Sequence, residues 1–207
     1  MQVILGKIAY RLGLPLTLSM KEGVLQSLNK KFGQQDEREL EWMLRQIKGV
    51  RSILEVGSCF GHTLKAMAAV AAPNARIRSI DLGAGVGIIG GMDTGKYLSS
   101  VIADLRSRGY DAAAQFGDSR RPEAVEWARR DGPYDFVFID GDHSYEGAKA
   151  DWLNYGPLGK VVGFHDIANI HHAVNKLWAE IKASGQRTDE IAENQMGIGL
   201  VFRSAGT

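Results

Sequence analysis

Apolar residues along this chain gather in short runs, which are separated by longer segments with helical periodicity. The clearest run is residues 134–140, YDFVFID, whose length and content of aromatic and β-branched residues favour a buried strand. The predicted strands are residues 51–56, 76–81, 110–116, 134–140, 160–166, 187–192 and 198–202. The predicted helices are residues 36–49, 64–71, 96–107, 122–130, 144–155 and 173–183. This alternation indicates an α/β fold with a mostly parallel sheet that is covered on both faces.

Capping residues and glycines suggest how the chain is divided. Asp36 can cap a helix whose Glu39 reaches back in a capping box, so one domain is predicted for residues 36–207. Residues 1–35 lack strand alternation and are interpreted as a helical or irregular N-terminal extension. Residues 83–95 are rich in glycine yet partly apolar, and form either a mobile loop beside the site or a plain surface loop.

Composition narrows the class of protein. The 207 residues suffice for one α/β domain with a sizeable core. A formal net charge of +1 gives no reason to expect nucleic acid or an acidic membrane as a partner. Cys59 is the single cysteine, and neither a signal peptide nor a membrane span is apparent, so we expect a cytoplasmic protein. The apolar positions of residues 1–35 are compatible with a homodimer.

Two glycines interrupt the chain after the first predicted strand. Glu55, Gly57 and Gly61 form the pattern E-x-G-x-x-x-G between that strand and a helix. Units of strand, glycine turn and helix bind nucleosides or phosphates in many α/β proteins. The dinucleotide fingerprint G-x-G-x-x-G is absent here, and an acid ahead of the turn would repel a pyrophosphate. The same acid suits a cationic ligand, and S-adenosylmethionine carries both an ammonium and a sulfonium.

Polar residues gather at the carboxyl ends of the predicted strands, where ligands of open α/β sheets bind. Asp81 ends the second strand and is expected to accept both ribose hydroxyls of an adenosine, in preference to capping a helix. Gly117, Asp118 and Ser119 follow the third strand, where they either read an adenine edge or form a plain turn. Glu55 must have a structural or ligand partner, because burial of an unpaired carboxylate is costly.

The run FIDGDHSYE, residues 138–146, concentrates groups that could do chemistry. Asp140, His165 and Asp166 end two successive predicted strands and could converge on a divalent cation such as Mg²⁺ or Mn²⁺. The alternative is that these acids cap helices. A bound cation would lower the pKa of a substrate hydroxyl. His143 could then remove the proton, because imidazole titrates near neutrality.

The remaining polar candidates receive structural interpretations. Cys59 precedes a helix N-terminus, where the pKa of a thiol can fall, but we favour a small packing residue. His171 and His172 are interpreted as the solvated start of a helix. Exposed helix faces are predicted for the arginines Arg120, Arg121, Arg129 and Arg130.

The segments ILEVGSCFGHTL, SIDLG, FIDGDHSYEGAKADW and VGFHDI together resemble class I S-adenosylmethionine-dependent methyltransferases. Within that class the chain is most similar to the small-molecule O-methyltransferase branch, which includes macrolide-sugar O-methyltransferases and cephalosporin-hydroxylase-like proteins. The resemblance covers residues 33–202. It implies a Rossmann-like three-layer sandwich, with a mostly parallel seven-stranded sheet whose last strand is antiparallel.

The same resemblance implies roles for individual residues. His143 matches the catalytic base of some relatives, and Asp140 is expected to share the catalytic corner with it. At the position of His165, relatives usually have a residue that offers an oxygen ligand. The histidine therefore favours a softer metal than Mg²⁺, or no bound metal at all. The residues implied to hold a metal are Asp140, His165 and Asp166. The residues implied to bind S-adenosylmethionine are Glu55, Gly57, Ser58, Gly61, Asp81, Gly117, Asp118, Ser119 and Asp140.

The predicted activity is transfer of a methyl group from S-adenosylmethionine to a hydroxyl oxygen of a small-molecule acceptor, with or without a divalent metal. A non-catalytic protein that binds a nucleoside cofactor is the main alternative, because fold alone does not determine function. A nicotinamide-dependent oxidoreductase is a further alternative, and the missing G-x-G-x-x-G pattern argues against it.

Overall fold

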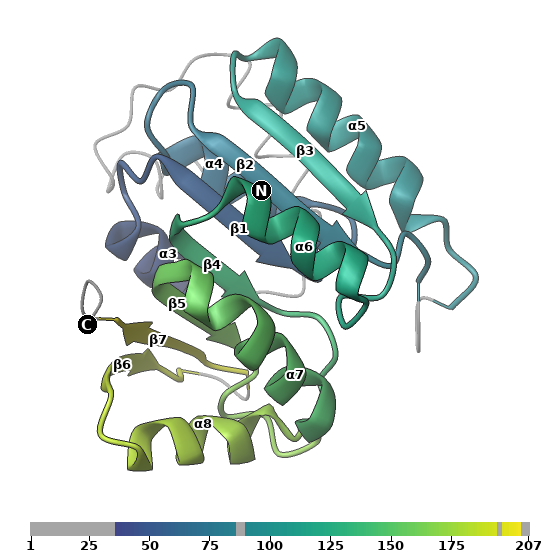
Figure 1. The fold of residues 1–207 in the computed structure, drawn as a ribbon. Helices are drawn as coiled ribbons and strands as arrows, with labels where there is room; N and C mark the ends of the chain where they lie inside the picture. The colour runs from purple at the N-terminus through teal and green to yellow at the C-terminus, as the bar shows by residue number, and fades with distance from the viewer. Residues whose placement is uncertain (1–35, 86–89, 194–195, 204–207) are drawn as a thin grey trace.

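A computed structural model describes residues 36–85, 90–193 and 196–203 of the chain, and Figure 1 labels its helices and strands. The predicted extension, residues 1–35, lies outside the described residues, as do residues 86–89 of the glycine-rich loop. Among the residues that are described, none of the helices combines the length and the apolar character needed to cross a membrane.

The strands of the described residues are β1 (Ser52–Val56), β2 (Arg76–Asp81), β3 (Asp111–Phe116), β4 (Tyr134–Ile139), β5 (Gly159–His165), β6 (Arg187–Ile191) and β7 (Ile198–Phe202). They form one seven-stranded sheet in the order β3-β2-β1-β4-β5-β7-β6 (Figure 1). The first five strands are parallel, and β7 pairs antiparallel with both β5 and β6. The predicted mostly parallel sheet, with its last strand antiparallel, is confirmed.

The described helices are α3 (Glu37–Gln46), α4 (His62–Val70), α5 (Thr94–Ser107), α6 (Pro122–Asp131), α7 (Tyr145–Tyr155) and α8 (Val174–Ala183), with a short 3₁₀ helix η2 (Gly156–Leu158). One face of the sheet is covered by α3, α4 and α5, through buried residues such as Met67 and Leu98. The other face is covered by α6, α7 and α8, through residues such as Tyr155 and Trp178, and Figure 1 views the molecule from this side. The result is the predicted three-layer sandwich.

The two apolar layers explain why the strands read as continuous apolar runs. In β1, Ile53 packs in the α3–α5 layer, whereas Leu54 packs in the α6–α8 layer. In β4, Phe136 and Val137 divide between the same two layers. Because successive side chains of a strand point to opposite faces, a sheet covered on both sides needs apolar residues at every position.

The helix ends depend on local hydrogen bonds. Asp36 caps α3 as predicted, because its carboxylate accepts amides of the first turn. The carboxylate of Glu39 accepts the amide of Gly197 at 3.2 Å, which ties α3 to the segment before β7. α5 begins slightly earlier than predicted, because Asp93 caps it by accepting the amide of Lys96 at 2.9 Å.

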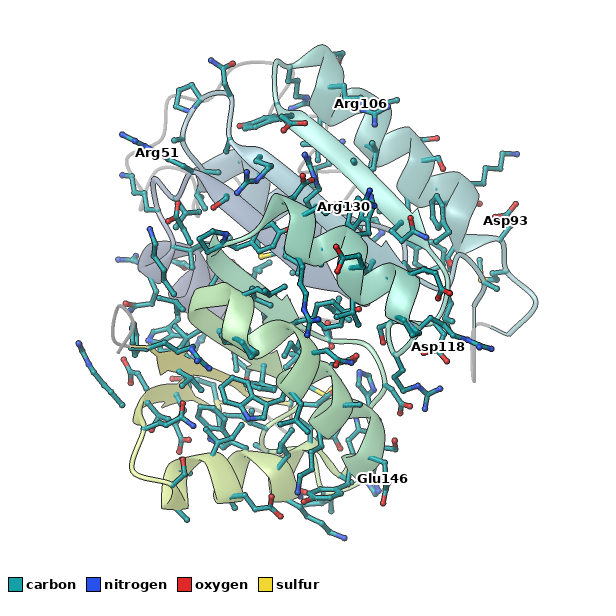
Figure 2. The ribbon with its side chains drawn as sticks, viewed as in Figure 1. Arg51, Asp93, Arg106, Asp118, Arg130 and Glu146 are labelled. Carbon is teal, nitrogen blue, oxygen red and sulfur yellow. The ribbon has the colours of Figure 1, made fainter. Side chains whose placement is uncertain are left out.

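Most charged groups lie on the outside of the molecule. Arg51 and Glu146 are exposed and lie at the periphery in Figure 2. Arg78 of β2, in contrast, is buried and forms ion pairs with Asp111 at 3.0 Å and with Asp131. Because a buried charge is tolerated only when it is paired, these ion pairs join β2 to the start of β3 and the end of α6.

Candidate functional site

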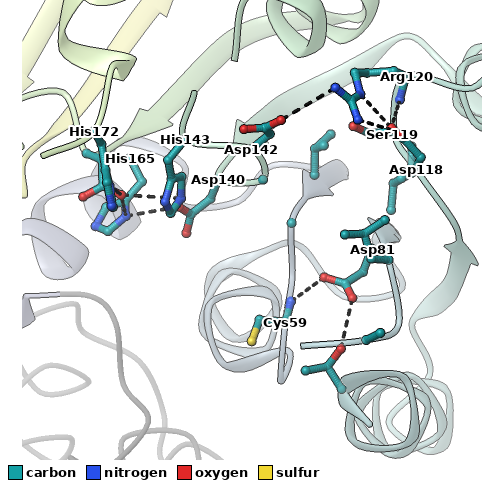
Figure 3. Close-up of a pocket in the computed structure, with 18 of the residues that line it drawn as sticks. Cys59, Asp81, Asp118, Ser119, Arg120, Asp140, Asp142, His143, His165 and His172 are labelled. Carbon is teal, nitrogen blue, oxygen red and sulfur yellow. Dashed lines mark hydrogen bonds and ion pairs between the residues drawn. The ribbon is translucent and has the colours of Figure 1, made fainter. Parts of the chain in front are cut away.

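One cavity of about 990 Å³ opens at the carboxyl ends of the five parallel strands β1 to β5 (Figure 3). The carboxyl ends of parallel strands lie at the same edge of a sheet, so residues far apart in the sequence meet there. The predicted cofactor residues that line the cavity are Gly57, Asp81, Gly117, Asp118, Ser119 and Asp140. The predicted base and the other two predicted metal ligands, His143, His165 and Asp166, line the same cavity.

Gly57 allows two loops of the site to approach each other closely. Its φ of +88° lies in the left-handed region, and a Cβ added there would be 2.2 Å from the carbonyl oxygen of Asp140. The amide of Gly57 donates to the carbonyl of Ile80, and the amide of Asp140 donates to the carbonyl of Val56, each at 2.8 Å. The turn after β1 is therefore held against the loop after β4, at a separation that only glycine permits.

Gly61 and Ser58 are not among the residues that line the cavity. Gly61 is the N-cap of α4 with a φ of +76°, and a Cβ there would lie 3.1 Å from the side chain of Val101 in α5. The hydroxyl of Ser58 lies 2.6 Å from the hydroxyl of Ser79. Both residues shape the turn by packing and hydrogen bonding, and their contact with a cofactor stays a prediction.

Glu55 of β1 is a fully buried carboxylate that also does not line the cavity. Among the described residues, no hydrogen-bond partner reaches either of its carboxylate oxygens. Burial raises the pKa of Glu55 well above its ordinary value; the nearby Ser58 side chain acts in the opposite direction, and the charges of Asp140 and Asp81 add to the increase. A ligand that brings a hydrogen-bond donor or a positive charge to Glu55 would offset the cost of burying its carboxylate.

Asp81 ends β2 and faces the cavity with a carboxylate that already organises the surrounding loops. Its Oδ2 accepts the amide of Cys59 at 2.7 Å (Figure 3), and its Oδ1 accepts the amide of Gly83 at 2.8 Å. The hydroxyl of Thr94 lies 3.4 Å from Oδ1. Because a carboxylate offers about four lone-pair sites, Asp81 can still accept a ribose hydroxyl while it holds the loops.

Cys59 lines the cavity as a protonated thiol. Its φ of +51° is uncommon for a residue with a side chain. Burial raises the pKa of Cys59 to about 11, and the charge of Asp81 contributes. Because the thiolate is the reactive form of cysteine, these features agree with the predicted packing role rather than with a nucleophile.

Asp118 and Arg120 form an ion pair at the rim of the cavity. Nε and Nη2 of Arg120 lie 3.0 and 2.9 Å from the two carboxylate oxygens of Asp118 (Figure 3). Hydrogen bonds from Arg120 lower the pKa of Asp118 to about 2. The helix-face positions predicted for Arg120 and Arg121 are wrong, because α6 begins only at Pro122. Arg120 belongs to the loop that lines the cavity, and Arg121 is the extended N-cap of α6.

A second acid, Asp151 of α7, lies behind Ser119 and was missed in the sequence. The hydroxyl of Ser119 donates to Oδ1 of Asp151 at 2.7 Å, and Oδ2 has no hydrogen-bond partner among the described residues. Asp151 is 0% exposed, and burial raises its pKa to about 6. The available signal was helical spacing, because Asp151 shares one face of α7 with the buried residues Ala148 and Tyr155.

Two carboxylates and three imidazoles meet on another side of the cavity (Figure 3). Oδ1 of Asp140 lies 3.3 Å from Nε2 of His143 and 3.1 Å from Nδ1 of His165. Oδ2 of Asp166 lies 3.5 Å from Nε2 of His143 and 3.4 Å from Nδ1 of His165. The same oxygen lies 2.8 Å from Nδ1 of His172. The structure thus brings together Asp140, His165 and Asp166, whose potential ligand atoms all lie within 4.8 Å of one another.

His172 belongs to this cluster, so the solvated helix start predicted for it is wrong. It lies in the loop before α8, with its ring centroid 4.3 Å from that of His143. Asn169 organises this loop, because its side-chain amide donates to Oδ1 of Asp166 and its oxygen accepts the amide of His171, each at 3.0 Å. The local sequence could not show that this loop folds back over the strand ends. The available signal was that two histidines follow soon after Asp166, the acid at a strand end.

The proximity of these groups shifts their protonation. Burial disfavours the charged form of His165, yet the carboxylates of Asp140 and Asp166 raise its pKa to about 10. The imidazoles in turn hold the pKa of both carboxyls below their usual range, although burial acts in the opposite direction. The pKa of His143 is also raised, because Asp140 outweighs burial. Near neutral pH the cluster therefore contains ionised carboxylates beside a positively charged imidazolium.

The sheet order, the glycine turn after β1 and the acid at the end of β2 define a class of protein, the Rossmann-like methyltransferases. The sequence profile of a family described as a methyltransferase domain matches residues 54–167, which is more than half of the chain. The chain belongs to this methyltransferase family. No curated protein matches it in sequence.

Solved structures have the same fold at low sequence identity. An O-methyltransferase from Bacillus cereus in complex with SAH aligns with a TM-score of 0.65 and 15% identity, covering 95% of this chain and 96% of that chain. The O-methyltransferase TomG from Streptomyces achromogenes, involved in tomaymycin synthesis and solved with SAM, gives 0.64 and 14%, covering 92% of each chain. The SAH-bound methyltransferase PaMTH1 from Podospora anserina gives 0.62 and 13%, covering 91% and 89%. At these identities the likeness concerns the fold.

Proposed function

We propose that this protein transfers a methyl group from S-adenosylmethionine to a hydroxyl oxygen of a small molecule. The observation that carries the proposal is a single cavity in which the Gly57 turn, Asp81 and the corner of Asp140 and His143 meet. The family match supports the methyl chemistry, and neighbours named as O-methyltransferases support oxygen as the acceptor atom. The nicotinamide alternative loses support, because the family is one of methyltransferases.

The residues around the cavity fit S-adenosylmethionine. The acceptor capacity left on Asp81 suits a ribose hydroxyl. Glu55 offers buried oxygens that suit a donor or a positive charge. Gly57 leaves open the space that a Cβ would fill beside the carbonyl of Asp140. Asp118 and Ser119 stay our proposal for the adenine side. When bound, S-adenosylmethionine supplies the methyl group on a positively charged sulfur.

Asp140, His165 and Asp166 fit a divalent cation, because two carboxylates and one imidazole present their ligand atoms within 4.8 Å of one another. Carboxylate oxygens suit Mg²⁺ and Mn²⁺, whereas the imidazole favours a transition metal. A bound cation would lower the pKa of the acceptor hydroxyl and hold its oxygen in place. We therefore propose these three residues as metal ligands.

Methyl transfer demands alignment more than covalent participation by the protein. The acceptor oxygen forms a bond to the methyl carbon, and the carbon–sulfur bond breaks with its electron pair returning to sulfur. The hydroxyl proton leaves to a base, so the products are a methyl ether and the neutral thioether S-adenosylhomocysteine. Holding the two reactants in line can contribute up to about 7–11 kcal/mol, which makes positioning the main task of the cavity.

His143 is the proposed base for the departing proton, and Asp140 is the proposed residue that orients it. Nε2 of His143 lies 3.3 Å from Oδ1 of Asp140, and 32% of the His143 side chain is exposed in a residue that lines the cavity. The pKa of His143 is raised by Asp140 despite burial, so its neutral, basic form becomes more populated as the pH increases. The rate of transfer should therefore increase with pH.

The partners of this domain follow from the same proposal. We propose a small hydroxylated acceptor and neither nucleic acid nor membrane, in accordance with a net charge of +1. We further propose residues 36–207 as the methyltransferase domain, residues 1–35 as an extension that supports a homodimer, and the cytoplasm as the location.

Calorimetric titration with S-adenosylhomocysteine and with NAD⁺ tests the cofactor. We expect binding of S-adenosylhomocysteine and not of NAD⁺, and we expect Asp81→Asn to weaken that binding at least about tenfold, because a charged acceptor is lost. Asp189→Asn, at an exposed position of β6, is the matched control and should leave the affinity unchanged. Preferential binding of NAD⁺, or an unchanged affinity in Asp81→Asn, would overturn the cofactor assignment.

Release of S-adenosylhomocysteine from S-adenosylmethionine, measured with a panel of hydroxylated small molecules, tests methyl transfer. His143→Gln should lower the rate about 10²- to 10⁴-fold while the affinity for S-adenosylhomocysteine is kept. The wild-type rate should increase with pH, and the rate of the variant should not. An unchanged rate in His143→Gln refutes the base assignment. Cofactor binding without methylation of any acceptor instead supports the non-catalytic alternative.

A further inference from the structure

Three imidazoles converge on one carboxylate oxygen in the candidate site. Nδ1 of His172 lies 2.8 Å from Oδ2 of Asp166. Nδ1 of His165 and Nε2 of His143 lie 3.4 and 3.5 Å from the same oxygen. The Asp166 side chain is only 1% exposed. Three ring nitrogens therefore face Oδ2. A carboxylate oxygen has two lone pairs, so it cannot accept a hydrogen bond from all three at once.

Hydrogen bonds to Asp140 can satisfy two of these ring nitrogens, because Nδ1 of His165 lies 3.1 Å from Oδ1 of Asp140. His143 can turn to Oδ1 of Asp140, which lies 3.3 Å from its Nε2. The other group near Nδ1 of His172 is the side-chain nitrogen of Asn169 at 3.2 Å, which is itself a donor. A cation beside Oδ2 of Asp166 is an alternative to these hydrogen bonds, because the imidazole nitrogens of His143 and His172 would then present lone pairs to it instead of protons.

We propose that His143, Asp166 and His172 form a second cation position, which takes a nitrogen-preferring divalent metal such as Zn²⁺ or Co²⁺. Their potential ligand atoms all lie within 4.8 Å of one another. Ligand atoms that share a transition metal with bonds near 2.1 Å lie about 3.0–3.5 Å apart. The separations of 2.8 and 3.5 Å from Oδ2 are close to that range. Two imidazoles and a carboxylate suit Zn²⁺ or Co²⁺, whereas Mg²⁺ prefers oxygen ligands.

Two loops supply the ligands, the one between β4 and α7 and the one between β5 and α8, which is why no single segment of the sequence shows the position. His143 follows β4, Asp166 follows β5, and His172 precedes α8. The amide of Ala173 donates to the carbonyl of His143 at 3.0 Å, which joins the two loops. The side chain of Asn169 donates to Oδ1 of Asp166 at 3.0 Å, so Oδ2 is left to face the imidazoles. The protein therefore holds all three ligands in place by bonds of its own.

This position has a consequence for the proposed base. It uses Nε2 of His143, so the neutral ring then carries its proton on Nδ1 and has no lone pair left to take a substrate proton. A cation held there therefore withholds His143 from the proposed methyl transfer. This consequence rests on the proposed function, whereas the cation position itself does not.

Calorimetric titration of the full-length, chelator-treated protein with ZnCl₂, CoCl₂ and MgCl₂ tests the position without any acceptor. We expect Zn²⁺ and Co²⁺ to bind, and His172→Ala to weaken both at least about tenfold while its titration with Mg²⁺ equals that of wild type. The visible absorption of bound Co²⁺ should change in the same variant, because a nitrogen ligand is lost. His62→Ala removes a half-buried histidine of α4 and is the matched control, with unchanged titrations expected.

Modification of His143 by diethyl pyrocarbonate, followed by peptide mass spectrometry, gives a second measurement. Zn²⁺ should protect His143 in the wild type and not in His172→Ala. Equal Zn²⁺ affinity and equal protection in the two proteins would overturn the proposal, and so would a wild type that binds no Zn²⁺. His172→Gln replaces the alanine variant if circular dichroism shows that the latter does not fold. Zn²⁺ binding without methylation of any acceptor would contradict the proposed function alone.

Discussion

The substitution Asp151→Asn tests the electrostatics behind the candidate site. One carboxylate oxygen of Asp151 accepts the Ser119 hydroxyl at 2.7 Å, and the other has no hydrogen-bond partner among the described residues. A Cβ added to Gly141 would lie 3.2 Å from that second oxygen, so the side chain is closely surrounded. Asparagine keeps the shape and the acceptor for Ser119, and it removes the charge.

The expected effect follows from the pKa of Asp151, which burial raises from 3.8 to about 6. The folded protein holds this proton more tightly than the unfolded chain does. The wild type therefore loses stability as the pH increases through about 6, by roughly 3 kcal/mol in total. About half of this loss falls between pH 5 and pH 7.5. Asp151→Asn lacks the titrating group, so its free energy of unfolding should increase relative to wild type over that range.

Urea unfolding followed by circular dichroism at several pH values measures this difference. The new amide can shift the free energy of unfolding by the same amount at every pH. This shift does not affect the test, because only the pH dependence of the difference between variant and wild type reports the titration of Asp151. Glu126→Gln, at an exposed position of α6, is the matched control and should track the wild type. A difference between Asp151→Asn and wild type that stays constant from pH 5 to pH 7.5 would refute the reasoning.

Two further predictions concern the loops and the sheet. Gly57→Ala places a Cβ 2.2 Å from the Asp140 carbonyl, so it should abolish measurable S-adenosylhomocysteine binding in calorimetry and lower the unfolding free energy by about 2 kcal/mol or more. Gly49→Ala has a similar φ of +82° but no neighbour within 4 Å, and equal losses in both variants would contradict the close-approach argument. Arg78→Met breaks the ion pairs with Asp111 and Asp131 and should cost about 3 kcal/mol in urea unfolding, whereas an unchanged midpoint would show that these pairs contribute nothing.

The fold could be predicted because each layer requires a pattern of apolar residues that is visible within a short segment of the sequence. A strand covered on both faces must be apolar at every position, as in residues 134–139 of β4, and such runs are visible without knowledge of their neighbours. A cap gave a further boundary, because Asp36 accepts amides of the helix that follows it. No local pattern indicates that β7 lies between β5 and β6, because strand order depends on contacts between distant segments.

The candidate site was predictable where a residue ends a strand or directly follows one. Asp81, Asp140 and Asp166 do so, and parallel strands carry their ends to one edge of the sheet. Arg120 and His172 were misread, because loops place them in the cavity and a loop's path depends on the surfaces around it.

The order of apolar and polar residues by itself determined the alternation of strands and helices, and with it the edge where ligands meet. Only the tertiary structure decided that Asp151 is buried behind Ser119 and that three imidazoles share one oxygen of Asp166. The physical reason is the distance along the chain over which each interaction acts. Periodicity and capping act over a few residues, whereas a protonation state or a ligand set depends on charges that the folded chain brings within a few ångströms of each other.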